Sequence, residues 1–468
     1  MPVFMHTFSE HNRHYVFDAN TNSILPISPQ QWPVMCAIEK GEINDEAKAL
    51  LERYREKGYF LDVDIQEIKH PDTDMMPYYL TRKLQKLTLQ VTQNCNLRCS
   101  YCVYGGMYET RPHAKKTMSF ETAKRAIDYV LANSIDTKSL NFGFYGGEPL
   151  LEMELIEKCI AYINEKGRNR EITFTITTNG TLLTTDIYEK LVSYNFDITI
   201  SLDGPQPVHD SARVYADGHG SFDDIVRNVH AIKEKFPEAQ KKLRFLAVVN
   251  PEINESCVEQ LYTMDEIFPE YGVNMNFVST TYASETITYS EELLDTHTQE
   301  QAKLFLYMLG KIDRSKVSLI ILGNIPSYHN DHELLRHKNI IRTSMHPGGP
   351  CLAGVDRLFV TVDGTFYPCE RVSETSDTMN IGNVYEGISL EKANAINNIG
   401  TTTAEECKKC WAIFHCKMCA AFSDDLNGFS REMRLNQCSA SRNTVESTLK
   451  TICFLKVHGY DFEKEIKT

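Results

Sequence analysis

The sequence predicts an α/β fold, with a partial (β/α)6 barrel between residues 76 and 312. Short apolar strands alternate with amphipathic helical segments across this range, a pattern typical of a parallel sheet with right-handed crossovers. Three cysteines, Cys95, Cys99 and Cys102, come directly after the first strand. Ligands bind at the carboxyl ends of the strands in such folds, so these thiols lie where chemistry is expected.

Residues 1–75 are predicted to form a smaller unit ahead of the barrel. Its expected elements are strands at Tyr15–Phe17 and Ser23–Leu25, a helix that begins after Ser28, a helix at Asn44–Lys57 and a strand at Tyr59–Ile65. Residues 67–85 are expected to form a linker because of their prolines. The order of elements resembles the winged-helix peptide-recognition domain that precedes many peptide-modifying enzymes, which implies a leader peptide paired with a strand edge. The alternative is a purely structural extension.

The barrel is expected to contain six strands with helices between them. The strands are expected at Leu87–Val91, Leu140–Tyr145, Ile172–Thr177, Ile198–Leu202, Leu243–Val249 and Val273–Val278. The helices are expected at Ser119–Ala132, Met153–Lys166, Asp186–Ser193, Phe222–Lys235, Ser256–Phe268 and Glu300–Lys311. A barrel of six units leaves an open side that would admit a large substrate.

The three cysteines after the first strand have the spacing of an iron–sulfur site. Cys95 and Cys99 are separated by three residues, and Cys99 and Cys102 by two. Three thiolates can bind three irons of a 4Fe-4S cluster, which leaves the fourth iron open. A structural zinc site or buried thiols are the alternatives, but zinc takes four ligands in such a site and no fourth Cys or His follows closely in the sequence.

This spacing resembles that of radical S-adenosylmethionine (radical SAM) enzymes, and the ends of the later strands extend the resemblance. In that family the open iron binds the methionine amine and carboxylate of SAM. By position, the resemblance implies SAM contacts from Tyr101, Gly146, Gly147, Glu148, Pro149, Asn179, Ser201, Asp203 and Arg213. Arg213 would grip the SAM carboxylate with its guanidinium. For Asn179 and Asp203 the alternative is turn capping, since Asn-Gly and Asp-Gly are ordinary turn sequences.

Seven more cysteines follow residues 313–350, which we treat as a bridging region. They are Cys351, Cys369, Cys407, Cys410, Cys416, Cys419 and Cys438. The first two flank a predicted hairpin with its turn at Asp363-Gly364. The pattern over residues 351–468 resembles the SPASM extension of peptide-modifying radical SAM enzymes, which holds two auxiliary 4Fe-4S clusters.

The resemblance assigns these cysteines to two sets by position. Cys351, Cys369 and Cys419 would bind the first auxiliary cluster; the second would take Cys407, Cys410, Cys416 and Cys438. The chain departs from the family in one place, because two residues rather than three separate Cys416 from Cys419. A zinc ribbon made of Cys407, Cys410, Cys416 and Cys419 is the alternative. It would leave the remaining three cysteines without a role.

Composition limits the classes of function. The net charge of −14 argues against a nucleic-acid partner, and no apolar run is long enough to span a membrane, so we expect a cytoplasmic protein. Fourteen cysteines in a long chain without a signal peptide favour metal binding over disulfides. The four outside the patterned groups, Cys36, Cys159, Cys257 and Cys453, are expected in the core.

The resemblance as a whole implies a radical SAM/SPASM maturase, most similar to the ranthipeptide maturases. It implies three 4Fe-4S clusters, SAM, a leader-bearing Cys-rich precursor peptide and an electron donor such as flavodoxin or ferredoxin. The implied product is a sulfur-to-carbon thioether; the alternatives are a formylglycine-forming sulfatase maturase, a carbon–carbon crosslinking maturase, or a metal-binding scaffold without activity. Glu370 follows Cys369, at the position where sulfatase-maturing relatives carry an aspartate that acts as a base, so the resemblance implies a catalytic role for Glu370. The alternative is that Glu370 is a solvated surface residue.

Overall fold

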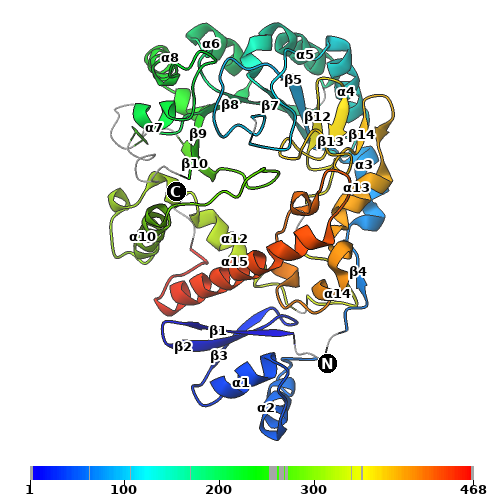
Figure 1. Ribbon diagram of the computed structural model, residues 1–468, viewed down its shortest axis with the longest axis vertical. Helices are drawn as coiled ribbons and strands as arrows, with labels where there is room; N and C mark the ends of the chain where they lie inside the picture. The colour runs from blue at the N-terminus through cyan, green and yellow to red at the C-terminus, as the bar shows by residue number, and fades with distance from the viewer. Residues whose placement is uncertain are drawn as a thin grey trace.

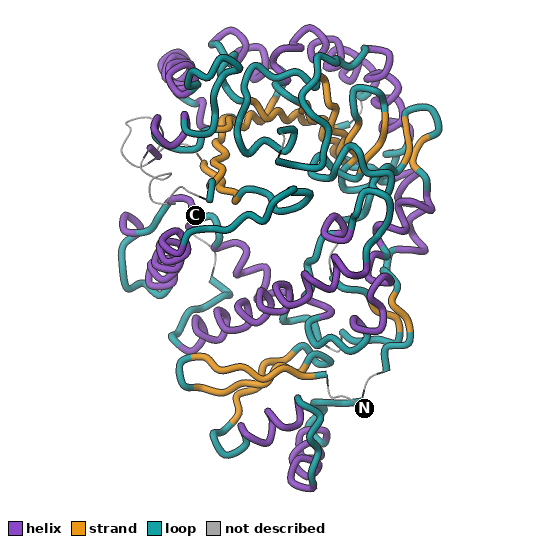
Figure 2. The backbone as a smooth tube through the Cα atoms, viewed as in Figure 1, coloured by secondary structure: helices purple, strands orange, loops and turns teal. Residues whose placement is uncertain are grey.

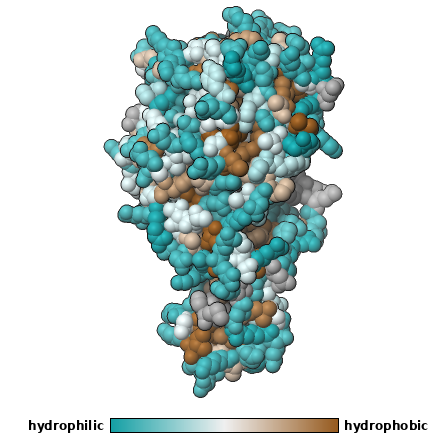
Figure 3. All heavy atoms as spheres, turned by 90° about the vertical axis from the view of Figure 1, so that its right-hand side faces the viewer, coloured by the Kyte–Doolittle hydropathy of each residue, from teal (hydrophilic) through white to brown (hydrophobic). Residues whose placement is uncertain are grey.

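The computed structural model describes residues 4–464, apart from residues 63, 106, 169, 252–260, 263–267, 269–271, 339 and 349–350. The barrel lies at one end of the molecule and the N-terminal unit at the other, with the long helix α15 (Arg431–Val457) crossing between them (Figure 1). The molecule narrows just above the N-terminal unit, as the space-filling view shows (Figure 3). None of the described helices is long and apolar enough to cross a membrane.

A ten-stranded sheet forms the barrel, with the order β10-β9-β8-β7-β6-β5-β12-β13-β14-β15. Its six consecutive parallel strands are β5 (Lys86–Thr92), β6 (Ser139–Gly146), β7 (Glu171–Thr178), β8 (Phe196–Ser201), β9 (Leu243–Val249) and β10 (Gly272–Phe277). They curve as a continuous arc in Figure 2. The predicted α/β fold with a parallel sheet is therefore confirmed, and the carboxyl ends of these strands meet at one rim.

Helices cover the outer face of the arc (Figure 1). They are α4 (Phe120–Ala132), α5 (Met153–Lys166), α6 (Thr185–Ser193), α7 (Gln206–Asp210) and α8 (Phe222–Lys235). The α4 helix begins where the Ser119 side chain accepts a hydrogen bond from the Thr122 backbone N–H, an N-cap of the usual kind. Helix α8 buries residues at helical spacing, Ile225, Val229 and Ile232, against the sheet.

The C-terminal hairpin continues the barrel sheet. Strand β12 (Leu358–Val360) pairs in parallel with β5, and β13 (Thr365–Tyr367), β14 (Gly382–Asn383) and β15 (Gly387–Ile388) follow in antiparallel pairs. Helices α13 (Leu390–Asn397) and α14 (Ala404–Cys407) lead from this hairpin toward α15. The sheet thus joins the two cysteine-bearing regions directly.

The N-terminal sheet is buried on both faces. It has the order β1 (Met5–Glu10), β2 (Arg13–Asp18), β3 (Ser23–Ile27). Side chains alternate along β2, so Val16 packs on α1 (Trp32–Glu39) and α2 (Asp45–Arg55), while Phe17 faces the core that includes α15. The unit therefore rests on the C-terminal cysteine region through an apolar interface.

Several predicted elements are wrong in position. No strand forms at Tyr59–Ile65 in its described residues, where Phe60 has φ +51°; the short strand β4 (Glu67–Ile68) pairs instead with β11 (Ser344–Met345). The helix expected after Ser28 begins at Trp32, which places Pro33 in its first turn. The expected linker contains α3 (Met76–Arg82), and β1 was not predicted.

The region before Cys351 is helical. Helix α10 (Glu291–Met308) begins nine residues before its expected start, at the Ser290 N-cap, and α11 (Leu319–Leu322) and α12 (Ile325–Leu334) follow. Most of the helix expected at Ser256–Phe268, together with Cys257, lies outside the described residues.

Candidate active site and iron–sulfur sites

The loop after β5 carries the loop thiols, Cys95, Cys99 and Cys102. The end of β6 passes close to the start of this loop: Gly147 N–H donates to Thr92 O at 2.9 Å, and Glu148 N–H donates to Asn94 O at 2.9 Å. A Cβ atom on Gly147 would lie 2.0 Å from Asn94 O, so only glycine fits at this crossing. The structure thus gives the Gly146-Gly147 pair a packing role toward the cysteine loop, and its contact with SAM stays a prediction.

Glu148 ties the ends of two strands together. Its carboxylate accepts hydrogen bonds from Thr178 Oγ1 (2.7 Å), Asn179 N–H (2.7 Å) and Leu150 N–H (3.0 Å). The side chain is fully buried, and burial raises the pKa of Glu148 to about 7. The carboxylate therefore organises the rim of the sheet through contacts within the chain, and Pro149 begins the short turn that follows.

Each loop thiol has a polar side chain beside it. The contacts are Asn179 Nδ2 to Cys95 Sγ (3.9 Å), Arg213 Nη1 to Cys99 Sγ (3.8 Å) and His113 Nε2 to Cys102 Sγ (3.7 Å). Burial raises the pKa of Cys95 to about 12, and the charges of the other two thiols add to this rise. The three thiols therefore lie within electrostatic reach of one another. His113 was not singled out from the sequence.

Arg213 and Asp203 form a buried ion pair behind the loop. Arg213 Nε donates to Asp203 Oδ2 at 2.9 Å, and Tyr101 OH donates to the same oxygen. The guanidinium also lies over the Tyr101 ring, 5.3 Å from its centre. Because Nε is committed to Asp203, Arg213 has its Nη atoms available toward the loop and any ligand there. Ser201 is buried at the end of β8 and precedes Asp203 closely in the sequence.

A second buried ion pair joins the cysteine loop to the C-terminal region. Arg111 Nε lies 2.7 Å from Glu374 Oε2, and both side chains are less than a tenth exposed. The Arg111 guanidinium lies 3.8 Å from the centre of the Tyr104 ring. Sequence reasoning missed this pair because 263 positions separate its members. It fixes the loop thiols relative to the hairpin that precedes Glu374.

The first thiol group consists of Cys351, Cys369 and Cys419. Burial raises the pKa of Cys369 to about 12, with a further contribution from the charge of Cys419. The pKa of Cys419 is raised by burial and by the charge of Cys351. The fold thus brings together three thiols that span 68 positions of the chain.

The second thiol group consists of Cys407, Cys410, Cys416 and Cys438. Burial raises the pKa of Cys410 to about 11, and the charges of Cys416 and Cys407 contribute. The pKa of Cys438 is raised by burial, with a contribution from Cys416. Cys416 Sγ also lies 3.2 Å from Ser441 Oγ on α15.

The charge of Cys416 acts on Cys407, Cys410 and Cys438, while Cys419 is affected by the charge of Cys351; the assignment of these cysteines to two cluster sets stays a prediction. Across the described residues, no three His, Cys, Asp or Glu side chains are spaced to hold a single metal ion. A 4Fe-4S cluster takes one thiolate on each iron and so spreads its ligands further apart than one zinc ion does. Sets made of thiols alone fit the ligand chemistry of iron–sulfur clusters, and that cofactor assignment stays a prediction.

Glu370 lies beside the first thiol group and is paired. Its Oε1 is 3.5 Å from Arg357 Nη1, and its side chain is about a quarter exposed, at 23%. A catalytic role for Glu370 stays a prediction.

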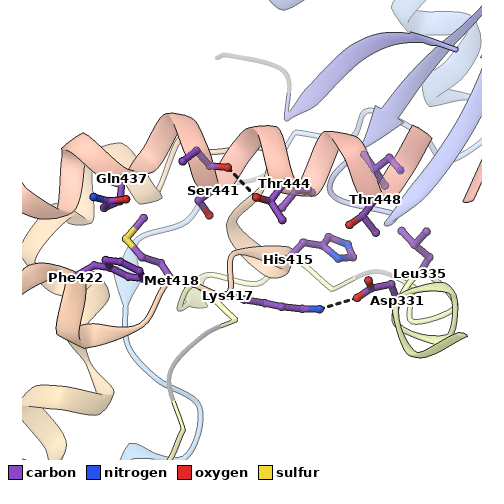
Figure 4. A pocket seen from close by; sticks show the side chains of 13 residues that line it. Asp331, Leu335, His415, Lys417, Met418, Phe422, Gln437, Ser441, Thr444 and Thr448 are labelled. Atoms are coloured by element: carbon purple, nitrogen blue, oxygen red, sulfur yellow. Dashed lines mark hydrogen bonds and ion pairs between the residues drawn. The ribbon is translucent and has the colours of Figure 1, made fainter. Parts of the chain in front are cut away.

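A cavity of about 250 Å³ borders the cysteine-bearing segment. It lies between α12, one face of α15 and the residues that flank Cys416 and Cys419 (Figure 4). Its wall is mainly apolar, and Lys417 Nζ pairs with Asp331 Oδ1 at 2.6 Å on one side. The lining residues include Leu335, His415, Met418, Phe422, Ala440, Thr444, Val445 and Leu449.

Comparison with known proteins supports the class of enzyme that this geometry indicates. Residues 89–264 match the Radical SAM superfamily. The chain is 25% identical over 401 residues to the radical SAM cyclopropyl synthase TigE of Paramaledivibacter caminithermalis, covering 81% of this chain and 76% of TigE. It is 31% identical over 153 residues to a cysteine-type anaerobic sulfatase-maturating enzyme of Clostridium novyi, covering 32% of this chain and 40% of that enzyme.

The fold is similar to that of a solved relative. Native anSMEcpe with bound AdoMet aligns with a TM-score of 0.58 at 20% identity, over 80% of this chain and 99% of that chain. Of the other curated relatives, two are matched over 49% and 34% of their length, and two cysteine-type sulfatase-maturating enzymes of Clostridium perfringens over 88% at 24% and 25% identity. Residues 89–264 thus match the Radical SAM superfamily, and the chain is similar to radical SAM enzymes that include a cyclopropyl synthase and sulfatase-maturating enzymes.

Proposed function

We propose that the chain is a maturase that installs sulfur-to-carbon thioether crosslinks in a ribosomally synthesised, Cys-rich precursor peptide. The observation that carries the proposal is that Cys419 interacts electrostatically with Cys351 and Cys369, and Cys416 with Cys410 and Cys438, which supports a set of three thiols and a set of four. A set of three thiolates leaves one iron of a cubane cluster without a protein ligand. A thiolate of the substrate is the natural ligand for that position.

When bound, the cluster on the loop thiols and SAM supply a 5'-deoxyadenosyl radical, and the chemistry of that radical belongs to the cofactor. This chain's own residues hold and orient the components. Asp203 fixes Arg213 beside Cys99, and the Arg111–Glu374 pair fixes the loop against the hairpin that leads to the first thiol group. On the peptide, one C–H hydrogen atom would pass to the 5'-deoxyadenosyl radical, the S–H hydrogen would leave as a proton, and one C–S bond would form. The remaining electron would pass to the auxiliary cluster on the first thiol group.

The peptide substrate is proposed from the N-terminal unit and the cavity. Residues 1–75 would bind the leader at an edge of the β1-β2-β3 sheet, because a strand can add to a sheet edge through backbone hydrogen bonds. The cavity beside Cys416 and Cys419 would hold an apolar side chain of the peptide close to the thiol groups. The remaining parts of this proposal are three 4Fe-4S clusters, SAM and an electron donor such as flavodoxin or ferredoxin.

A second candidate is carbon–carbon bond formation on a peptide. TigE, whose name describes a cyclopropyl synthase, aligns with 81% of this chain. Formylglycine formation, by analogy with the sulfatase-maturating relatives, is the third candidate. These reactions differ in what they do to thiols, so one measurement separates them.

The test is anaerobic co-expression with a Cys-rich peptide encoded beside the gene, followed by mass spectrometry before and after alkylation. Thioether formation predicts a loss of about two hydrogen masses per event and one cysteine per event protected from alkylation. The same mass loss with every thiol free to react would support carbon–carbon bond formation instead. An unchanged peptide, with SAM cleaved, would contradict the proposed substrate.

A further inference from the structure

Arg434 is the largest fully buried side chain among the described residues, and its guanidinium lacks a counter-charge there. It is 1% exposed, on α15, four residues before Cys438. Its Nε donates to Thr403 Oγ1 at 3.1 Å, while Nη1 is buried without a hydrogen-bond partner. Within the described part of the chain no carboxylate pairs with it. An unpaired buried cation is costly, so this guanidinium requires an anion.

Two cysteines of the second thiol group, Cys407 and Cys438, lie close to Arg434. Thr403 Oγ1, which accepts from Arg434, lies 3.4 Å from Cys407 Sγ. Cys438 Sγ donates to the Arg434 carbonyl at 3.6 Å, one helical turn along α15. The positive charge of Arg434 acts to lower the thiol pKa of both cysteines. Four thiolates on one 4Fe-4S cluster carry net negative charge, which supplies the anion that the guanidinium lacks.

We infer that Arg434 is a positioning residue for an iron–sulfur cluster on the second thiol group, where its buried charge offsets that of the cluster and raises the cluster's reduction potential. This rests on the part of the proposed function that puts a cluster there, and it is independent of the peptide chemistry. One-electron reduction adds a negative charge to the cluster. A cation held at short range in a buried site favours that reduced form by Coulombic attraction.

The experiment is an anaerobic redox titration of the reconstituted full-length protein, followed by EPR, with iron content measured in parallel. Arg434→Gln and Arg434→Met remove the charge, and Arg434→Lys keeps it. The matched control is Arg442→Met, because Arg442 is exposed on the same helix and its charge also reaches Cys410 and Cys438. Water screens the Arg442 charge, so its removal should matter little.

The expected result is that one reduction step moves to lower potential in the two neutral variants. The equilibrium constant for that step should fall more than tenfold, which is more than 59 mV for one electron. Arg434→Lys and Arg442→Met should stay within tenfold of the wild type. Recovery of iron-loaded protein from the Lys variant but not from the neutral variants would equally show a requirement for charge.

Three outcomes would overturn the inference. The first is that the neutral variants keep every reduction step in place. The second is that the reduction potential shifts as far in Arg434→Lys as in Arg434→Gln. Loss of iron from all three Arg434 variants would show a requirement for shape rather than charge. If the wild type lacks a reduction step that depends on Cys407, the cluster itself is absent, and the proposed function fails at that point rather than the role of Arg434 alone.

Discussion

Replacing Asp203 by asparagine tests the charge network behind the loop thiols. Asp203 is 1% exposed, and its carboxylate accepts from Arg213 Nε (2.9 Å), Tyr101 OH and Val248 N–H (3.0 Å). The Asn variant keeps the size of the side chain but leaves Arg213 as a buried cation without its counter-charge. Removing one partner of a buried ion pair costs about 3–5 kcal/mol.

The assay is anaerobic denaturant unfolding of the reconstituted protein, with iron content measured on the same samples. Asp203→Asn should lower the free energy of unfolding of the barrel by about 3–5 kcal/mol and should reduce the iron held by the loop thiols, because Arg213 Nη1 lies 3.8 Å from Cys99 Sγ. The matched control is Asp136→Asn. Asp136 pairs with Arg82 at 2.6 Å on the surface, where ion pairs contribute little.

The reasoning is refuted if both variants unfold at the same denaturant concentration as the wild type, or if Asp136→Asn is as damaging as Asp203→Asn. Either result would mean that burial does not determine the strength of the Asp203–Arg213 pair.

Two further predictions concern the N-terminal interface and the glycine crossing. His6 lies between Glu39 (2.7 Å) and Glu446 (2.9 Å); burial acts to lower its pKa, but the two carboxylates outweigh it and raise the pKa above 6.5. The charged form of His6 stabilises the contact between the N-terminal unit and α15 fully below pH 6.5, and this stabilisation is lost as pH rises through the raised pKa. Limited proteolysis should therefore release the N-terminal unit faster at about pH 9 than at about pH 6. The His6→Gln variant should lack that difference. Gly147→Ala places a Cβ atom 2.0 Å from Asn94 O and should abolish iron binding by the loop thiols, as measured by iron content.

A specific result would contradict each of the predictions for His6 and Gly147. A pH dependence of proteolysis that survives in His6→Gln would assign it to another group. The matched control for the crossing is Gly428→Ala, where the only neighbour of the added Cβ is Asp425 Oδ1 at 3.8 Å. Full iron in Gly147→Ala, or equal loss in Gly428→Ala, would contradict the packing role of Gly147.

Where apolar residues recur regularly, the sequence predicted the bounds of helices and strands of the barrel accurately. The predicted bounds of α5, α8 and β9 match the structure, because their apolar spacing is regular. Strand β1 was missed since only Met5 and Phe8 are buried in it, among polar residues. The strand expected at Tyr59–Ile65 failed because Phe60 turns the chain with a positive φ, which β-propensity does not reveal.

The sequence predicted which residues belong to the candidate site but not which of them contact one another. The sequence singled out Gly146, Arg213 and Asp203, yet the glycine crossing and the ion pair that fixes Arg213 depend on segments brought together by folding. Arg434 was overlooked, although its spacing of four from Cys438 places both on one helix face. That spacing is a signal that sequence reasoning could use.

The central claim is that the loop thiols form a radical SAM centre. The most direct measurement is formation of 5'-deoxyadenosine from SAM by the anaerobically reconstituted, dithionite-reduced protein, compared with Cys99→Ala. The account predicts that the wild type produces 5'-deoxyadenosine and that Cys99→Ala produces none, while the variant keeps the iron of the two C-terminal thiol groups. Undiminished 5'-deoxyadenosine from Cys99→Ala, or none from an iron-loaded wild type, would contradict it.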